Sequence, residues 1–302
     1  MGTPSLRTGR NAVRFIGLGY FHRGSRISTV MKDALSPTER SGQWDRLEDM
    51  SPEEIAKAMS ACDQEAAVAV NRISHDIGRV IGLALDRVME GGRVFYLGAG
   101  TSGRLGILDA SEIPPTFGVS GRFIGLIAGG DGAIRQAVEG AEDDKQGGIR
   151  DLQSRSAEAV DVVVGIAASG RTPYVVGALE WARKEGMMTV AITSNPQGAV
   201  VLAAEHALVA ETGPEFVTGS TRLKAGTAQK LILNQISTGI MIGSGHVQGN
   251  RMVDMQLANA KLVERGTRMV AEALDLPMDR ARQLLTEVGS VRKAIDTFAS
   301  RE

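Results

Sequence analysis

The spacing of apolar residues in the first third of the chain is helical. The run Ser-Pro-Glu-Glu at residues 51–54 has the spacing of a capping box, with proline at the first helical position, and predicts that a helix begins there. Apolar residues then recur three and four positions apart from Ala66 to Leu85, until Gly91-Gly92. The pattern predicts one long amphipathic helix that ends at these glycines, within a helical lead-in over residues 36–91.

From Arg93 onward, short apolar runs alternate with helical stretches. The runs are apolar throughout, which is typical of strands that are buried on both faces of a parallel sheet. Strands that alternate with helices predict an α/β fold, a doubly wound parallel sheet flanked by helices in a three-layer αβα sandwich. The expected strands are residues 94–97, 123–128, 160–167, 188–193 and a weaker 206–210.

After these runs the pattern is helical to the end of the sequence. A long helix is expected over residues 220–242, and another from about Met252 to Ala273. Two short helices, near residues 278–285 and 290–299, complete a C-terminal helical region that we bound at 246–302. No low-complexity linker separates a second core, so residues 92–245 are expected to form one domain between helical N- and C-terminal appendages.

The composition adds to this picture only by arguing against some kinds of partner and cellular location. The chain has 302 residues, of which 43% are hydrophobic and 4% aromatic, and its formal net charge is −1. Few aromatic side chains and no overall basic field argue against a nucleic-acid partner. The longest apolar stretch, at 231–242, is interrupted by polar residues and too short to span a membrane. A single cysteine, Cys62, fits a reducing cytoplasm. We expect a cytoplasmic protein without membrane or nucleic-acid partners.

Residues 1–35 differ from the rest of the chain in charge. They contain five arginines and one lysine against one acid, Asp33. Their apolar patch at residues 15–20 is too short for the core of a secretory signal. We expect a basic, disordered extension that carries no chemistry, with a transit segment as the alternative.

Two loops repeat one pattern, in which an apolar run leads into small and hydroxyl-bearing residues that include Ser-Gly-Arg. Such turns at the carboxyl end of a strand, followed by the N-terminus of a helix, form a cradle for an anion. Two cradles at one sheet edge suit a small phosphorylated ligand. The alternative is that the hydroxyls only cap the helices that follow. The predicted binding residues are Gly100, Thr101 and Ser102 in the first loop and Ser169, Gly170, Arg171 and Thr172 in the second.

The first loop also satisfies a dinucleotide-binding pattern through Gly98, Gly100 and Gly103. A nicotinamide site needs an acidic residue about 20 positions further on, and Asp131, the acid that ends the next strand, comes later than that. Neither loop has the Gly-Lys-Ser/Thr ending of a nucleoside triphosphate site. A dinucleotide site therefore ranks second to a phosphate cradle.

The sequence around the first loop resembles the signature of N-acetylmuramic acid 6-phosphate etherases. Residues 98–118 read GAGTSGRLGILDASEIPPTFG, and the similarity continues in the blocks at 127–130, 137–143, 162–174, 218–230 and 250–254. The resemblance implies a sugar isomerase (SIS) fold, with a phosphosugar-binding SIS domain over residues 92–245. It implies a carbon–oxygen lyase that converts N-acetylmuramic acid 6-phosphate to N-acetylglucosamine 6-phosphate and D-lactate in cell-wall recycling. It also implies a homodimer with sites near the subunit boundary.

The resemblance maps the family's two functional carboxylates onto Glu112 and Glu142. It implies that Glu142 removes the C2 proton of the open-chain aldehyde, while Glu112 protonates the departing lactate oxygen and then activates water. This chemistry needs no metal and no organic cofactor. Lys224, inside the block STRLKAG, is expected to face the sugar phosphate, with ordinary helix solvation as the alternative.

Other interpretations of these residues stay open. The acidic run at residues 142–144 is ordinarily a solvated surface, and as a Mg²⁺ site it lacks a second cluster to complete the ligand shell. The four histidines have no metal-ligand spacing, so we expect no metal. Glucokinase regulatory proteins resemble these etherases and sense sugar phosphates without turnover. A non-catalytic regulator that binds phosphosugars is therefore the alternative function.

Overall fold

The computed structural model describes residues 36–299, and the extension expected over residues 1–35 lies outside the described residues. The described part contains a five-stranded parallel sheet with the strand order β2-β1-β3-β4-β5. All five strands lie where the apolar runs predicted them. They are β1 (Val94–Gly98), β2 (Phe123–Ile127), β3 (Val162–Ile166), β4 (Met188–Thr193) and β5 (His206–Val209).

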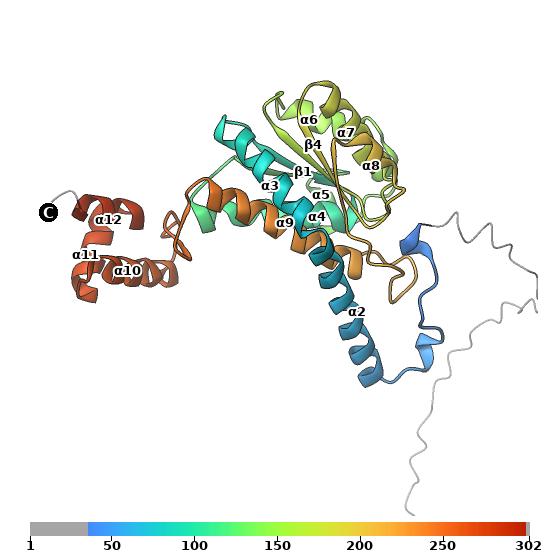
Figure 1. The fold of residues 1–302 in the computed structure, drawn as a ribbon, viewed down its shortest axis with the longest axis horizontal. Coiled ribbons are helices and arrows are strands. Elements are labelled where there is room, and N and C mark those ends of the chain that lie inside the picture. Colours follow the sequence, from blue (N-terminus) through green and yellow to red (C-terminus); the bar gives the residue numbers. More distant parts are fainter. Residues whose placement is uncertain (1–35, 300–302) are drawn as a thin grey trace, which may run out of the picture. The chain divides into compact units, whose positions relative to one another are not determined.

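Alternate side chains of each strand enter two separate cores, one on each face of the sheet. Val94 and Tyr96 of β1 are fully buried in the first core, and Phe95 and Leu97 in the second. The three-layer αβα prediction is confirmed, and Figure 1 shows helices on both sides of the strands. The first face is covered by α2 (Pro52–Arg72), α3 (Ser74–Met89), α4 (Gly100–Phe117) and α9 (Lys224–Gly243), and the second by α6 (Gly147–Ser154), α7 (Pro173–Lys184) and α8 (Ala199–Ala203).

The helical lead-in begins as predicted but is not one helix. Two short 3₁₀ helices, η1 (Pro37–Glu39) and η2 (Leu47–Asp49), precede the predicted helix start at Ser51. The capping box is present, because Ser51 Oγ accepts from Glu54 N at 3.3 Å and Ser51 N donates to Glu54 Oε2 at 2.8 Å. The prediction of a single long helix is wrong, because α2 and α3 are separated at Ile73, which has φ −105° and ψ 16°. No glycine or proline marks this break in the sequence.

The C-terminal region opens with a hairpin, so the helix expected from Met252 begins later than predicted. Strands β6 (Val247–Gln248) and β7 (Arg251–Met252) pair antiparallel. The helix α10 (Ala260–Leu274) starts where the Asn259 side chain accepts a hydrogen bond from Leu262 N at 3.0 Å. Helices α11 (Met278–Val288) and α12 (Val291–Ala299) follow, as the pattern predicted. The three helices share a core of their own with the segment that follows β7.

Asp254 joins this segment to α12 and to the hairpin. Its two carboxylate oxygens accept from Arg292 Nε and Nη2, each at 2.6 Å, and Oδ2 lies 2.7 Å from His246 Nδ1. Burial by itself raises the pKa of Asp254, but the hydrogen bonds and charges of Arg292 and His246 outweigh burial and hold the pKa below its ordinary value.

We expect Asp254→Asn to lower the stability at neutral pH by roughly 1.5 kcal/mol, because it weakens hydrogen bonds to a charged group. The folded-state pKa is depressed, so the carboxylate stabilises the fold above the ordinary carboxyl range and loses this effect as pH falls through the folded pKa. Thermal unfolding at a series of pH values should therefore show that the variant loses less stability than the parent as the pH is lowered. Asp275→Asn, at an exposed position, is the control. An equal loss of stability at low pH in Asp254→Asn and in the parent would contradict the assignment of this pH dependence to Asp254.

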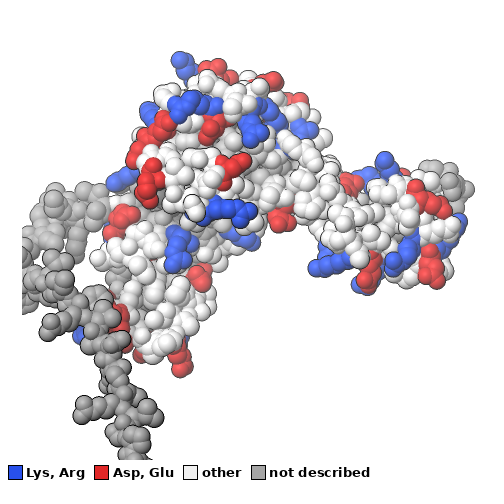
Figure 2. All heavy atoms as spheres, turned by 180° about the vertical axis from the view of Figure 1, so that it is seen from behind, with Lys and Arg blue, Asp and Glu red and all other residues white. Residues whose placement is uncertain are grey.

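Two further properties are relevant to membrane and nucleic-acid partners. No helix within residues 36–299 combines the length and the apolar character that crossing a bilayer requires. On the face drawn in Figure 2, basic and acidic side chains are interspersed, in keeping with a formal net charge of −1.

Candidate active site

The chain changes its direction across the sheet between β1 and β3, which are neighbouring strands. After β1 it forms β2 on one side, and it then returns to add β3 on the other. The last residues of the two strands, Gly98 and Ile166, pair with each other. In open α/β sheets, ligands bind in the crevice at the carboxyl ends of the strands at such a switch point. The two predicted loops follow β1 and β3, so the structure brings them side by side at this crevice.

The helices that follow these loops begin without a side-chain cap. Ala99 is the N-cap residue of α4 and Thr172 that of α7, and the structure shows no capping hydrogen bond from either side chain. By contrast, Ser51 and Asn259 cap α2 and α10. The interpretation that Thr172 serves to cap its helix is therefore wrong. The first N–H groups of α4 are left for an anion to bind, whereas α7 begins with Pro173, which has no N–H, and Val175 N donates to Thr172 O at 3.0 Å.

The glycines of the first loop are required by close packing against the strand. A Cβ on Gly103 would lie 2.6 Å from the Gly98 carbonyl oxygen, and one on Gly98 would lie 2.8 Å from Gly103 N. Any other residue at either position would force this turn apart. The spacing that resembles a dinucleotide fingerprint thus has a structural cause in the strand-to-helix turn itself.

Ser102 connects the first loop to α9. Its side chain is buried, and Oγ donates to Gln229 Oε1 at 2.9 Å, while Gln229 Nε2 has no partner within the described residues. Thr101 lies beside the start of the same helix, since a Cβ on Gly226 would be 3.6 Å from Thr101 Cγ2. The hydroxyl proton of Ser102 is therefore engaged inside the protein.

We expect Ser102→Ala to lower the free energy of unfolding by about 1–3 kcal/mol, because it leaves the buried amide of Gln229 without any partner. Ser102→Ala combined with Gln229→Met should recover most of this loss, since no unsatisfied polar group then remains. Urea unfolding of the two variants and the parent measures both effects. A double variant no more stable than Ser102→Ala would contradict this role of the pair.

The second loop is held rigidly from the end of β4. Gly170 has φ +71°, and a Cβ on it would lie 2.7 Å from Gly198 Cα. Asn195 Nδ2 donates to Ser169 O at 2.9 Å, and Ser169 Oγ accepts from Arg171 N at 3.3 Å. Arg171 is exposed, whereas Ser169 is half-buried. The loop is preorganised by its own backbone and by its neighbour, which suits it to hold an anion in one position.

Glu142 lies beside the first loop, in a cavity of about 170 Å³ that Gly100 also lines. Glu142 belongs to the 3₁₀ helix η3 (Ala141–Asp143). Arg104 lines the same cavity, and its guanidinium donates to the carbonyl oxygens of two residues of α5 (Gly132–Arg135) at 2.8 and 2.9 Å. Glu139 is a lining carboxylate that sequence reasoning did not select, although it stands three residues before Glu142 in the same block.

Glu112 is not among the described residues that line this cavity. It stands on α4 twelve positions after Gly100, which places it roughly 18 Å further along the helix axis. Its side chain is exposed, on the stripe of α4 that also carries Leu108 and Pro115. Within one chain, the structure brings Gly100 and Glu142 together but does not bring Glu112 to them.

Lys224 lies in a different cavity, of about 210 Å³, next to the start of α9. Its side chain is buried, so the interpretation as ordinary helix solvation is wrong, and Nζ lies 2.7 Å from Glu65 Oε2. Glu215 caps this helix by accepting from Lys224 N and Ala225 N at 2.9 and 3.0 Å. Burial raises the pKa of Glu215, although these hydrogen bonds oppose the shift. The cap lies nine residues before the helix, outside any capping-box spacing, so the sequence could not reveal it.

Asp109 supports the contact between α4 and α9. It is buried, and Oδ1 accepts from Asn234 Nδ2 at 2.6 Å and from Ser237 Oγ at 3.2 Å. Burial raises the pKa of Asp109, and the hydrogen bonds from α9 oppose that shift. The two helices that reach the first loop are thus joined by a buried polar contact.

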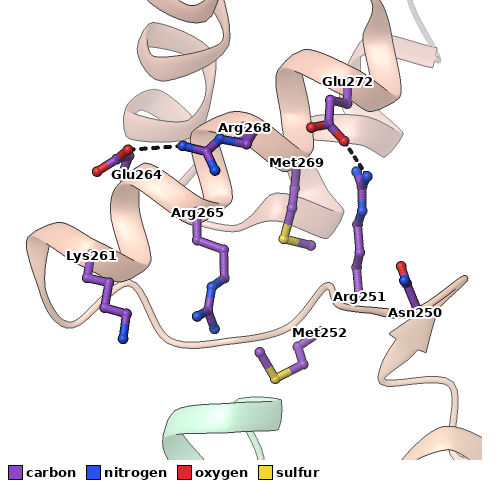
Figure 3. A pocket seen from close by; sticks show the side chains of 9 residues that line it. All are labelled: Asn250, Arg251, Met252, Lys261, Glu264, Arg265, Arg268, Met269 and Glu272. Atoms are coloured by element: carbon purple, nitrogen blue, oxygen red, sulfur yellow. Dashed lines mark hydrogen bonds and ion pairs between the residues drawn. The ribbon is translucent and has the colours of Figure 1, made fainter.

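A third cavity, of about 480 Å³, lies in the C-terminal region and contains none of the predicted site residues. Figure 3 shows Arg268 turned to Glu264 and Arg251 turned to Glu272, while Lys261 and Arg265 point from α10 toward the loop before it. Among residues 36–299, no cluster of three or more His, Cys, Asp or Glu side chains could hold a metal ion.

The fold and the paired loops define an SIS-domain protein. The model of the glucokinase regulatory protein N-terminal SIS domain matches residues 76–183, and that of the SIS domain matches residues 143–238. Among solved structures, a phosphoheptose isomerase from Francisella tularensis is 20% identical, with a TM-score of 0.49 over 64% of this chain and 99% of the other.

The relatives in sequence identify the family. An N-acetylmuramic acid 6-phosphate etherase from Bacteroides thetaiotaomicron is 51% identical over 262 residues, which cover 86% of this chain and 95% of that protein. An etherase of the same name from Porphyromonas gingivalis is 51% identical over 87% of this chain and 97% of its own length. One from Salmonella agona is 48% identical over 87% and 92%. The chain belongs to the N-acetylmuramic acid 6-phosphate etherase family.

Proposed function

We propose that this protein cleaves the D-lactyl ether of N-acetylmuramic acid 6-phosphate and releases N-acetylglucosamine 6-phosphate and D-lactate. The observation that carries the proposal is the pair of uncapped helix N-termini at the switch point between β1 and β3, with the Glu142 carboxylate beside the first. An anion cradle next to a carboxylate suits a phosphorylated substrate that must lose a proton. The name of the etherase family identifies this substrate as N-acetylmuramic acid 6-phosphate.

We assign the 6-phosphate to the second loop. The positive end of the α7 dipole favours a dianion at this loop, and Ser169, Gly170, Arg171 and Thr172 would surround it. The first loop would contribute the N–H groups of Gly100, Thr101 and Ser102, because the Ser102 hydroxyl already donates to Gln229. Lys224 would have to leave Glu65 to reach the ligand.

The two carboxylates divide the reaction between them. Glu142 takes the C2 proton of the open-chain aldehyde, and the electron pair of that C–H bond forms the C2–C3 double bond as the C3–O bond breaks. Glu112 gives its proton to the departing lactate oxygen. Water then adds at C3 as Glu112 takes a proton from it, and Glu142 returns a proton to C2. Every proton is thereby accounted for without a further reactant.

We propose in addition that the protein is a cytoplasmic homodimer. Its one cysteine, Cys62, is unpaired and buried, which fits a reducing compartment. The distance between Glu112 and the cavity of Glu142 also favours an assembly in which two chains meet at the site.

The test is to incubate the purified protein with N-acetylmuramic acid 6-phosphate and to measure D-lactate and N-acetylglucosamine 6-phosphate. We expect the two products in equal amounts. Saturable binding of the substrate without release of lactate would reject the etherase function and leave the regulator alternative.

A further inference from the structure

We propose that Arg104 binds the lactyl carboxylate of the substrate and thereby selects a sugar that carries this acidic side group. This role rests on the proposed function and adds to it the part of the substrate that the cavity beside the first loop receives. The sugar product, N-acetylglucosamine 6-phosphate, lacks the lactyl group, so Arg104 would also distinguish the substrate from this product.

The position of Glu142 determines which part of the substrate meets the cavity. A base must come within about 3 Å of the atom whose proton it takes, and the atom assigned to Glu142 is C2. The lactyl ether is attached to the neighbouring carbon, C3, so its carboxylate is only a few bonds from C2. The lactyl group would therefore lie at the cavity that Glu142 lines.

The cavity fits a lactyl group in size and in lining. Its volume of about 170 Å³ corresponds to roughly six water molecules, about the number of non-hydrogen atoms in a lactyl ether. The whole phosphosugar is several times larger. Five alanines and Val138 line the cavity, and such small apolar side chains suit the methyl group of the lactyl unit. A Cβ on Gly129 would lie 2.8 Å from Val138 Cβ, so Gly129 is needed for this wall to pack closely.

The charges in the cavity make a cation necessary for this ligand. Glu139 and Glu142 both line it, and a further carboxylate would be repelled there unless a positive charge were in contact with it. Arg104 is the one basic residue among the described residues that line the cavity. Lys224 lies in a different cavity and is paired with Glu65. The guanidinium of Arg104 is therefore the group that can neutralise the lactyl carboxylate.

The guanidinium of Arg104 is held in place and keeps one edge for a ligand. Nε donates to Ile134 O at 2.9 Å and Nη2 donates to Ala133 O at 2.8 Å. Within residues 36–299 these are its hydrogen bonds, and together they use one edge of the planar group. The other edge, Nη1 and the second N–H of Nη2, matches the two oxygens of a carboxylate. Because the arginine is already ordered, binding costs less conformational entropy.

A phosphate is the other anion that an arginine at this place could bind. We assign the 6-phosphate to the second loop, at the start of α7. None of residues 169–172 of that loop is among the described residues that line the cavity of Arg104. The two anionic groups of the substrate would thus bind at two separate places, the phosphate at the second loop and the carboxylate at Arg104.

The first half of the test compares two ligands on the wild-type protein. In the lactamide of N-acetylmuramic acid 6-phosphate, an amide replaces the lactyl carboxylate, which keeps the size of the group and removes its charge. We expect kcat/KM to be about 10- to 100-fold lower for the lactamide, mostly through a higher KM, because the charged hydrogen bonds are lost in the ground state and the transition state alike. Equal kcat/KM for the two ligands would overturn the proposal.

The second half of the test assigns this preference to Arg104. Arg104→Gln should lose the preference for the acid over the lactamide, and Arg104→Lys, which keeps the charge but not the planar edge, should keep part of it. Arg122→Gln is the matched control, because Arg122 Nη1 also donates to two backbone carbonyls, of Gly91 and Gly92 at 2.6 and 2.8 Å, outside the described lining of the cavity. It should keep the wild-type preference. All three variants should bind N-acetylglucosamine 6-phosphate as the wild type does, which also shows that they fold.

The outcomes separate the role of Arg104 from the proposed function. If the wild type releases no lactate from the acid, the proposed function fails and the role of Arg104 fails with it. If the wild type is active and Arg104→Gln keeps the full preference for the acid, the function stands and the role of Arg104 is wrong. A fall of about tenfold or more in the affinity of Arg104→Gln for N-acetylglucosamine 6-phosphate, without a fall in Arg122→Gln, would mean that Arg104 binds the phosphate and would also overturn the proposal.

Discussion

Glu142→Gln is expected to lower the rate of D-lactate release roughly 10²–10⁴-fold, the usual contribution of a positioned general acid or base. Glutamine keeps the size of the side chain but cannot take the C2 proton. Glu142 is exposed in η3, so the change should leave the fold intact. Binding of N-acetylglucosamine 6-phosphate, measured by calorimetry, should change little because the phosphate is held elsewhere.

The control for this variant is Asp143→Asn. Asp143 is the next residue in the same acidic run and is also exposed, but it is not among the described residues that line the cavity. We expect its turnover to stay within about threefold of wild type. Lactate release by Glu142→Gln at the rate of this control would remove Glu142 from the mechanism.

Gly170→Ala is expected to lower both phosphosugar affinity and stability. Two effects add at this position. The left-handed backbone, with φ +71°, costs a residue with a Cβ about 1–2 kcal/mol. The new methyl group would also lie 2.7 Å from Gly198 Cα, so the loop must move, which costs a further 1–3 kcal/mol or so. Because the moved loop no longer presents its N–H groups correctly, we expect affinity for N-acetylglucosamine 6-phosphate to fall about tenfold or more.

Gly121→Ala separates these two effects. Gly121 has φ +72°, nearly the same backbone, but nothing lies within 4 Å of a Cβ placed on it. It should lose only the backbone contribution to stability and none of the affinity for the phosphosugar. Calorimetric titration and urea unfolding of both variants measure the difference. Equal phosphosugar affinity in Gly170→Ala and Gly121→Ala would show that the second loop does not hold the ligand.

The sheet could be predicted from the sequence because its determinants are local. Runs such as Val94 to Leu97 are short and apolar on both faces, and between helical stretches this pattern is typical of strands inside a parallel sheet. The start of α2 was equally accessible, because the Ser51 capping box lies within four residues. The break at Ile73 was not, since it is a single residue between two helices and the apolar spacing continues on both sides of it. The hairpin at residues 247–252 was missed because its strands are only two residues long.

The site could be predicted only in part, because its remaining properties depend on tertiary contacts. The two loops and Glu142 were found from turn composition and from the family resemblance, and the structure brings Gly100 and Glu142 to one cavity. The pairing of Lys224 with Glu65 joins residues that are far apart in sequence, and no spacing reveals it. The distance of Glu112 from that cavity follows from the helical rise of α4, once the helix is known to run unbroken from Gly100 to Glu112.

The central claim is that the ether is cleaved by elimination and addition of water at the sugar carbon. The most direct measurement is to run the reaction in water enriched in the heavy oxygen isotope and to analyse both products by mass spectrometry. The account predicts that the label enters the C3 hydroxyl of N-acetylglucosamine 6-phosphate and that the lactate stays unlabelled. Label in the lactate, with none at C3 of the sugar, would mean that water attacks the lactyl carbon and would contradict the roles proposed for Glu112 and Glu142.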